Sequence, residues 1–190
     1  MPLPIHFSLP IAGQSVAATP PTTGSATAAK PPGHEITTFD PAADAAAVAA
    51  LADACRSEAG PQAGHFVPAG LLGELASRPG RLVQAWLAWP EEHDRRSTSG
   101  GPAFAETCAG PLGLVALVVT TGAAGPRASI GWLLVHPAAR RRGIARSLVE
   151  TAVRAAAAAG ARTVSAETLP TWPAAVAFWR AAGFRERRPP

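Results

Sequence analysis

The residues best suited to chemistry lie in one uninterrupted segment, Val135–Leu148, with the sequence VHPAARRRGIARSL. The pattern predicts a strand ending near Val135, a short turn, and a helix beginning near Gly143. The first N–H groups of a helix have no acceptor inside the helix, and the helix dipole adds positive potential there. Because such an end binds phosphate readily, the segment predicts a site for a pyrophosphate group.

Small and cationic residues in the same segment strengthen this prediction. Gly143 has no Cβ atom, so the backbone can approach a ligand closely there, and Ala145 is small enough to allow the same. Guanidinium groups donate charge-assisted hydrogen bonds to phosphate oxygens, and the segment holds Arg140, Arg141, Arg142 and Arg146. An ordinary strand-to-helix turn with solvated arginines has the same composition, so the segment alone leaves both interpretations open.

The charge of the chain is distributed unevenly. Residues 138–190 carry ten arginines against three glutamates, a net charge of +7, whereas residues 1–137 carry seven Lys or Arg against ten acids, a net charge of −3. A basic C-terminal third fits an anionic partner, either a nucleic acid or a phosphorylated cofactor. No pattern of interleaved aromatic and basic residues accompanies the arginines, so we expect no nucleic acid partner.

Other composition features exclude several classes of protein. The two cysteines, Cys55 and Cys108, are too few for a disulfide framework or a zinc site, so we expect reduced thiols and no metal. No apolar run approaches the roughly 20 residues that span a bilayer, so no membrane partner is expected. Pro4 and Pro10 interrupt the N-terminal apolar stretch, which does not resemble a signal peptide, and the cytoplasm is the expected compartment.

Composition divides the chain into two parts. Residues 1–33 are rich in Pro, Ala, Thr, Ser and Gly and are predicted to be a disordered N-terminal tail. Residues 34–190 are predicted to form one domain. Strands are expected over 36–39, 81–89, 112–119, 128–135 and 161–168, and a short one from Phe184. Helices are expected over 43–56, 69–77, 143–159 and 173–182. A turn over 120–126 and loops over 57–66 and 90–110 complete an α/β or α+β layered domain.

The phosphate-binding segment resembles the acetyl-CoA-binding motif of the GNAT superfamily of N-acetyltransferases, V-x-P-x-x-R/Q-x-x-G-x-G/A. The motif positions are filled without a gap by Val135, Pro137, Arg140, Gly143 and Ala145. The family's C-terminal motif, A-x-x-F-Y-x-x-x-G-F, resembles residues 175–184, AVAFWRAAGF. One helix and one strand separate the two motifs, as the family requires, and the pair is more specific than either motif alone.

This resemblance implies a fold and a cofactor. The fold is a mixed, mostly antiparallel sheet flanked by helices, in which the parallel strands 128–135 and 161–168 splay apart. Acetyl-CoA is the implied acyl donor, with its pantetheine arm between the splayed strands and its pyrophosphate on the amides of residues 141–145. The implied cofactor-binding residues are Leu134, Val135, Arg140, Arg141, Arg142, Gly143, Ile144, Ala145 and Arg146.

The implied chemistry is acyl transfer to an amine, which needs a proton acceptor for the amine and donors for the oxyanion. Glu167 is the one acidic residue between Glu150 and Glu186, and it lies near the end of a predicted strand. A glutamate at this place serves many family members as a base, directly or through water, so Glu167 is the predicted catalytic residue. A surface or ion-paired glutamate is the alternative.

The chain departs from the family pattern in three places. Trp179 occupies the position where many members carry a tyrosine that protonates the leaving thiolate, and the chain has no tyrosine. Trp172 replaces an asparagine that often precedes the last helix. The chain also stops six residues after Phe184, which predicts a truncated last strand. The expected consequence is a more open substrate cleft, or completion of the sheet by another chain, as in a homodimer.

Taken together, these features predict an N-acetyltransferase. It would transfer an acetyl group from acetyl-CoA to a primary amine of a small molecule or of a protein or peptide. The alternative is a GNAT-fold protein that binds CoA without catalysis, as a sensor or interaction module. The absence of tyrosine favours this alternative, whereas Glu167 and the intact phosphate-binding segment oppose it.

Overall fold

A computed structural model of the chain describes residues 3–11, 33–59, 73, 81–90 and 110–187. Its strands join into one seven-stranded sheet in the order β2-β3-β4-β5-β6-β1-β7. The strands are β1 (Ile5–Pro10), β2 (His34–Thr38), β3 (Arg81–Pro90), β4 (Gly113–Gly122), β5 (Gly125–Val135), β6 (Thr163–Thr168) and β7 (Arg185–Arg187). Only β5 and β6 pair in parallel; the other pairs are antiparallel. The predicted mixed sheet with one parallel pair is therefore confirmed.

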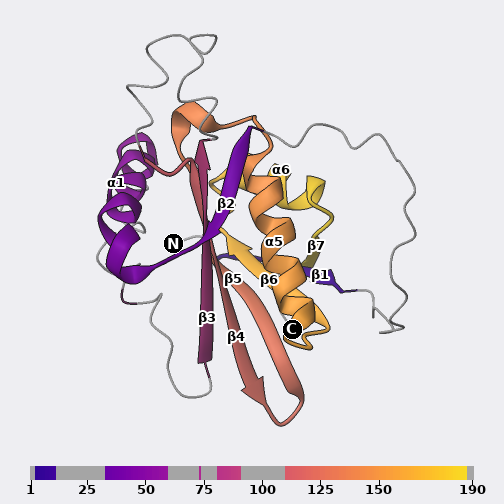
Figure 1. Ribbon diagram of the computed structural model, residues 1–190. Helices are drawn as coiled ribbons and strands as arrows, with labels where there is room; N and C mark the ends of the chain where they lie inside the picture. Colours follow the sequence, from indigo (N-terminus) through magenta and orange to yellow (C-terminus); the bar gives the residue numbers. More distant parts are fainter. Residues whose placement is uncertain (1–2, 12–32, 60–72, 74–80, 91–109, 188–190) are drawn as a thin grey trace, which may run out of the picture.

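Helices cover both faces of this sheet (Figure 1). Helix α1 (Pro41–Ala59) lies on one face, and α5 (Ile144–Ala158) and α6 (Pro173–Ala181) lie on the other. Each face has its own apolar cluster: Val48 and Leu51 of α1 pack with β3, β4 and β5, whereas Leu148 of α5 and Trp179 of α6 belong to the opposite cluster. The result is a three-layer arrangement that buries both sides of the central strands.

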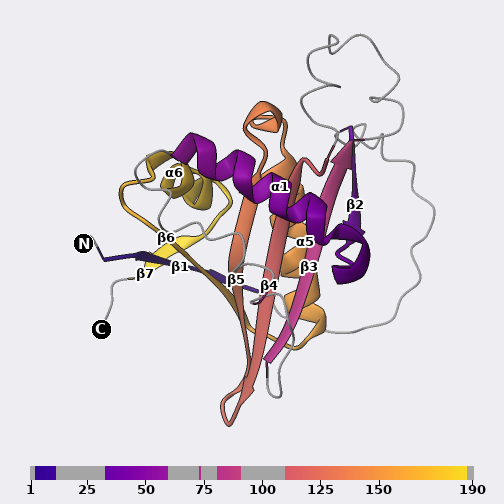
Figure 2. The same ribbon diagram turned by 90° about the vertical axis from the view of Figure 1, so that its left-hand side faces the viewer.

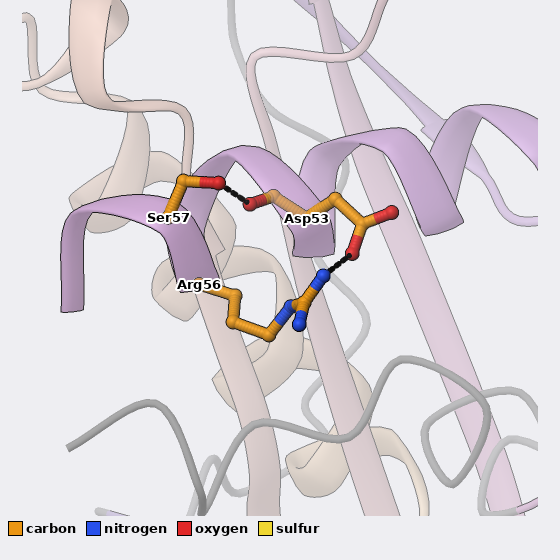
Figure 3. A network of polar contacts seen from close by, with 3 residues as sticks. All are labelled: Asp53, Arg56 and Ser57. Carbon is orange, nitrogen blue, oxygen red and sulfur yellow. Dashed lines mark hydrogen bonds and ion pairs between the residues drawn. The ribbon is translucent and has the colours of Figure 1, made fainter. Parts of the chain in front are cut away.

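The solvent-facing side of α1 is tied together by local polar contacts (Figure 3). Arg56 Nη2 lies 2.9 Å from Asp53 Oδ1, and Ser57 Oγ donates to the Asp53 carbonyl at 2.9 Å. At the other end, Asp40 Oδ1 accepts from the Ala42 N–H at 2.9 Å, as a helix cap does. These exposed pairs stabilise the helix by a few tenths of a kcal/mol each, so its place is set by the buried face.

The β4–β5 hairpin is longer than the sequence predicted. The strands continue to Gly122 and resume at Gly125, which pair with each other, so only residues 123–124 form the turn instead of residues 120–126. Gly125 has φ +93°, a left-handed conformation that glycine adopts without a Cβ clash. This short turn lets two long strands run side by side up to the functional segment.

The largest difference from the sequence prediction concerns the N-terminal residues. Ile5–Pro10, predicted to be part of a disordered tail, form strand β1 between β6 and β7. Phe7 is completely buried in the cluster beneath α5 and α6, so its burial compensates the entropy of ordering the segment. Residues 12–32 of the predicted tail lie outside the described residues.

The last described strand is short and lies beside the N-terminal strand. β7 has only three residues, as the short C-terminus predicted, and it pairs with β1. β1 lies between β6 and β7 in the same sheet, and the more open cleft and the homodimer suggested by the sequence stay predictions. Apart from Gly73, which is helical, the predicted helix over 69–77 lies outside the described residues, as do most of the predicted loops over 57–66 and 90–110.

Candidate functional site

The site is organised around the point where the parallel strands part. β5 and β6 pair only through residues 128–130 and 164–166. At the same level the pairing of β4 with β5 shifts register: Leu117 pairs with Ile130 and Ala116 with Trp132, which leaves Gly131 as a bulge residue. A bulge bends its strand and increases the local twist, which accounts for the separation. Figure 2 shows β5 continuing along β4 while β6 slants away from it.

The turn after β5 is held by its own side chains. A short 3-10 helix, η3 (Pro137–Ala139), follows His136, whose Nδ1 accepts from the Ala138 N–H at 3.3 Å. Partial burial, and secondarily the positive charge of Arg140, lower the pKa of His136 below 6.5. A neutral imidazole can act as this acceptor, whereas a protonated one cannot.

Arg140 closes the turn from the other side. Its Nε donates to the Val135 carbonyl at 3.3 Å, and that carbonyl also accepts a weak hydrogen bond from the Cys55 thiol at 3.5 Å. Cys55 is buried on α1, so the end of β5 contacts both the turn and the helix on the opposite face. Arg140 therefore has a structural contact in addition to any role with a ligand.

The start of α5 has the backbone conformation of an anion-binding turn. Arg141 and Gly143 both have positive φ, +65° and +81°. A left-handed residue other than glycine is uncommon, and it turns successive N–H groups toward one concave side. The Ser147 N–H bonds to the Gly143 carbonyl at 3.1 Å, which is the first turn of the helix. A Cβ added at Gly143 would meet nothing within 4 Å, so the turn opens outward.

Buried neighbours fix this turn in place. Ile144 and Leu148 face the core and are at most 2% exposed, while Arg140, Arg141, Arg142 and Arg146 are exposed. A Cβ on Gly113 of β4 would lie 2.8 Å from the Leu134 carbonyl oxygen and 3.0 Å from Leu148 Cδ1. Glycine at position 113 is therefore what lets α5 pack closely on the end of the β4–β5 pair.

Glu167 lies directly after the last residue of β6 that pairs with β5, Ala166. Because parallel strands end at the same edge of a sheet, Glu167 and the turn after Val135 flank the same parting of the strands. The Glu167 side chain is 63% exposed, and its Oε1 lies 3.0 Å from Nδ1 of His6 in β1. The sequence predicted neither this histidine nor any contact of the N-terminus with Glu167.

The two tryptophans that depart from the family pattern have structural places. Trp179 is 5% exposed and makes edge-to-face contacts with Phe178 and Phe184, with ring centroids 5.2 and 4.8 Å apart. Trp172 is the N-cap residue of α6, and its backbone N–H donates to the Leu169 carbonyl at 3.0 Å. The Trp179 ring thus packs α6 against Phe184, the residue directly before β7, as its apolar surroundings require.

Two other kinds of feature are absent from the described residues. No group of three or more His, Cys, Asp or Glu side chains in the ranges given above gathers as a metal site would require. Within the same ranges, no helix is long and apolar enough to cross a membrane.

Comparison with known sequences identifies the family. The family model described as the acetyltransferase (GNAT) family matches residues 71–184, which include both motifs and the whole β5–α5–β6–α6 region. The chain therefore belongs to the GNAT acetyltransferase family. A search of curated protein sequences finds no significant match.

Solved structures support the same fold. A tandem GNAT protein from the clavulanic acid biosynthesis pathway matches with a TM-score of 0.57 and 18% identity, over 97% of this chain and 50% of that chain. This chain thus spans half the length of that tandem protein. AAC(6')-Iy, solved with the bisubstrate analogue CoA-S-monomethyl-acetylneamine, matches with a TM-score of 0.57 and 17% identity, over 83% and 94%.

A third similar structure is a GCN5-related glucosamine N-acetyltransferase region of a fungal multi-domain GH3 β-N-acetylglucosaminidase. It matches with a TM-score of 0.60 and 17% identity, over 88% of this chain and 18% of that one. At such identities these matches establish the GNAT fold.

Proposed function

We propose that the protein is an N-acetyltransferase that transfers the acetyl group of acetyl-CoA to a primary amine of a small molecule or of a protein or peptide. The observation that carries this proposal is the parting of β5 and β6 beside a left-handed, outward-facing turn at the start of α5. The family membership and the amine-acetylating enzymes among the similar structures support it.

The turn after β5 is the proposed binding element for the pyrophosphate of acetyl-CoA. Backbone N–H groups of residues 141–145 would donate to the phosphate oxygens, and the exposed guanidinium groups around them would add charge-assisted donors. Leu134 and Val135, at the end of β5, would lie along the pantetheine arm. Ile144 is buried, so it contributes its N–H while its side chain anchors the helix.

Glu167 is the proposed proton acceptor. A primary amine is protonated near neutral pH, so its ammonium form must first give one proton to the carboxylate. The neutral nitrogen then attacks the thioester carbon, a C–N bond forms and the C–S bond breaks. The sulfur leaves with the electron pair and takes up the second proton that the nitrogen loses. Exposure of the Glu167 side chain lets the first proton pass on to water.

The leaving thiolate is not assigned a protein acid. Trp179 is buried against two phenylalanines, and an indole N–H is a hydrogen-bond donor that does not ionise in this range. A free thiol has a pKa near 8.5, so the thiolate is a good leaving group and can be protonated by water. The same observation favours the second candidate function, a CoA-binding GNAT protein without catalysis.

Two measurements separate these functions. Acetyl-CoA at about 100 times its dissociation constant adds roughly 2.7 kcal/mol to the free energy of unfolding, which would raise the melting temperature by several degrees. Release of free CoA is then measured over a panel of amines and peptide N-termini. Binding with CoA release supports the transferase, binding without release for any amine supports the non-catalytic protein, and no binding at millimolar concentration contradicts both.

The role of Glu167 is tested by Glu167→Gln, which keeps the shape of the side chain and removes its basicity. Turnover is expected to fall by about 100-fold to 10,000-fold, with the affinity for acetyl-CoA unchanged, because a base acts in the transition state and lies away from the phosphates. Glu150→Gln, an exposed substitution on α5, is the matched control and should retain turnover. Full activity of Glu167→Gln between pH 6 and 9 would remove Glu167 from the mechanism.

A further inference from the structure

The N-terminal strand β1 pairs with β6 at Glu167, the proposed proton acceptor. Nδ1 of His6 lies 3.0 Å from Oε1 of Glu167, and the two residues are direct partners in the antiparallel pairing of these strands. We propose that His6 is a positioning residue that holds the Glu167 carboxylate, so that the N-terminal strand completes the active site. This inference rests on the proposed function and assigns a further residue to it.

Alternation along both strands fixes the direction of the two side chains. In β1, Phe7 is completely buried among residues of α5 and α6. In β6, Ala166 and Thr168 are buried, at 1% and 7% exposure. Neighbouring residues in a strand point to opposite faces, so His6 and Glu167 share the face that is opposite to α5 and α6. Their side chains are 43% and 63% exposed, which leaves them accessible to a substrate.

The two oxygens of the Glu167 carboxylate have different roles in this arrangement. Oε1 contacts the imidazole, and the second oxygen is left to accept a proton from an incoming ammonium group. An exposed glutamate otherwise samples several rotamers, and holding one of its oxygens restricts it to the orientation that the reaction needs. His6 thus acts through Glu167 and is not itself required to touch the substrate.

Three variants test the proposal with acetyl-CoA and an amine that wild type acetylates. His6→Ala removes the hold on the carboxylate and is expected to lower kcat by up to about 100-fold, with the acetyl-CoA affinity unchanged. His6→Gln has an amide that can donate to the same oxygen. It should restore most of the wild-type rate, because the amide donor again holds the carboxylate.

Ser8→Ala changes the same face of β1 two residues further on and should keep the wild-type rate and pH profile. A wild-type rate in His6→Ala at every pH would overturn the proposal. A rate in His6→Gln as low as in His6→Ala would also overturn it, because an amide donor would then fail to hold the carboxylate.

A measurement without catalysis separates this inference from the proposed function. The ¹⁵N chemical shift of His6 Nδ1 should change in Glu167→Gln and stay unchanged in Ser8→Ala, whether or not the protein acetylates any amine. If wild type transfers acetyl to no amine while this shift change is seen, the transferase proposal fails and the pair stands. If the shift does not respond to Glu167→Gln, the pair itself is wrong.

Discussion

The two halves of the sheet are built in different ways. In the first half, β3, β4 and β5 follow one another through the sheet and are covered by α1 on one face and α5 on the other. The second half consists of β6, β1 and β7, which come from opposite ends of the chain. Figure 2 shows β1 and β7 lying clear of α1, so that among the described helices none covers this face of the second half.

The first half of the sheet contributes most of the buried apolar surface, whereas the second half carries the side chains of the proposed reaction. Strands covered on both faces have continuous apolar runs, as LVALVV in β4 does, and their burial stabilises the domain. Strands covered on one face alternate, so they can present His6 and Glu167 to solvent while Phe7 is buried behind them. The half with the weaker sequence signal therefore holds the proposed proton acceptor and its positioning residue. The bulged strand β5 lies between the two halves.

The largest expected effect tests how far the second half depends on the N-terminal strand. Phe7→Ala removes a completely buried aromatic ring and is expected to lower the free energy of unfolding by about 3–5 kcal/mol, measured by urea denaturation. Leu82→Ala in the first half is the control, because Leu82 is 47% exposed and should change stability by less than about 0.5 kcal/mol. If Phe7→Ala and Leu82→Ala were equally stable, the domain would not need β1 for its stability.

The next effect tests the packing of the first half against α5. In Gly113→Ala the new Cβ would lie 2.8 Å from the Leu134 carbonyl oxygen, so the backbone must shift, at a cost of about 1–3 kcal/mol. Gly122→Ala lies in the same strand with nothing within 4 Å and should be neutral in the same urea titration. If both substitutions were neutral, the close approach at Gly113 would not matter.

A third comparison separates backbone strain from ligand binding. Gly143 and Gly125 both have positive φ, and a Cβ added at either position would meet nothing within 4 Å, so alanine at either should cost about 1–2 kcal/mol. Only Gly143→Ala lies at the proposed phosphate turn and should weaken acetyl-CoA binding, measured by calorimetry. Equal loss of binding in both variants would mean that the effect is one of general stability.

The smallest effect concerns the turn that joins the two halves. The pKa of His136 is lowered in the folded protein, so protonation favours the unfolded chain. The stabilising contribution is complete above about pH 6.5 and is lost as the pH falls below that value. Wild type should therefore lose more stability between pH 7.5 and 5.5 than His136→Asn, which retains a capping acceptor. An identical pH dependence of the melting temperature in both proteins would contradict this assignment.

Local sequence patterns were enough to predict the central strands and helices and the turn that precedes α5. Strands 81–89 and 112–119 and the helices after Asp40, Gly143 and Trp172 were predictable because apolar periodicity, glycine and proline act locally. The two motifs identified the family, which the match over residues 71–184 confirms. The roles assigned to the turn residues and to Glu167 stay predictions, since they concern a ligand.

The place of the N-terminus, in contrast, became known only from the assembled fold. Ile5, Phe7 and Leu9 alternate with polar residues as in a half-buried strand, but a six-residue strand between prolines is too short a signal to stand against its proline- and alanine-rich surroundings. Its partner, β6, begins more than 150 residues later, and no local pattern encodes a pairing over that separation. The contact of His6 with Glu167 exists because burial of Phe7 fixes the register of β1, and that burial requires the assembled core.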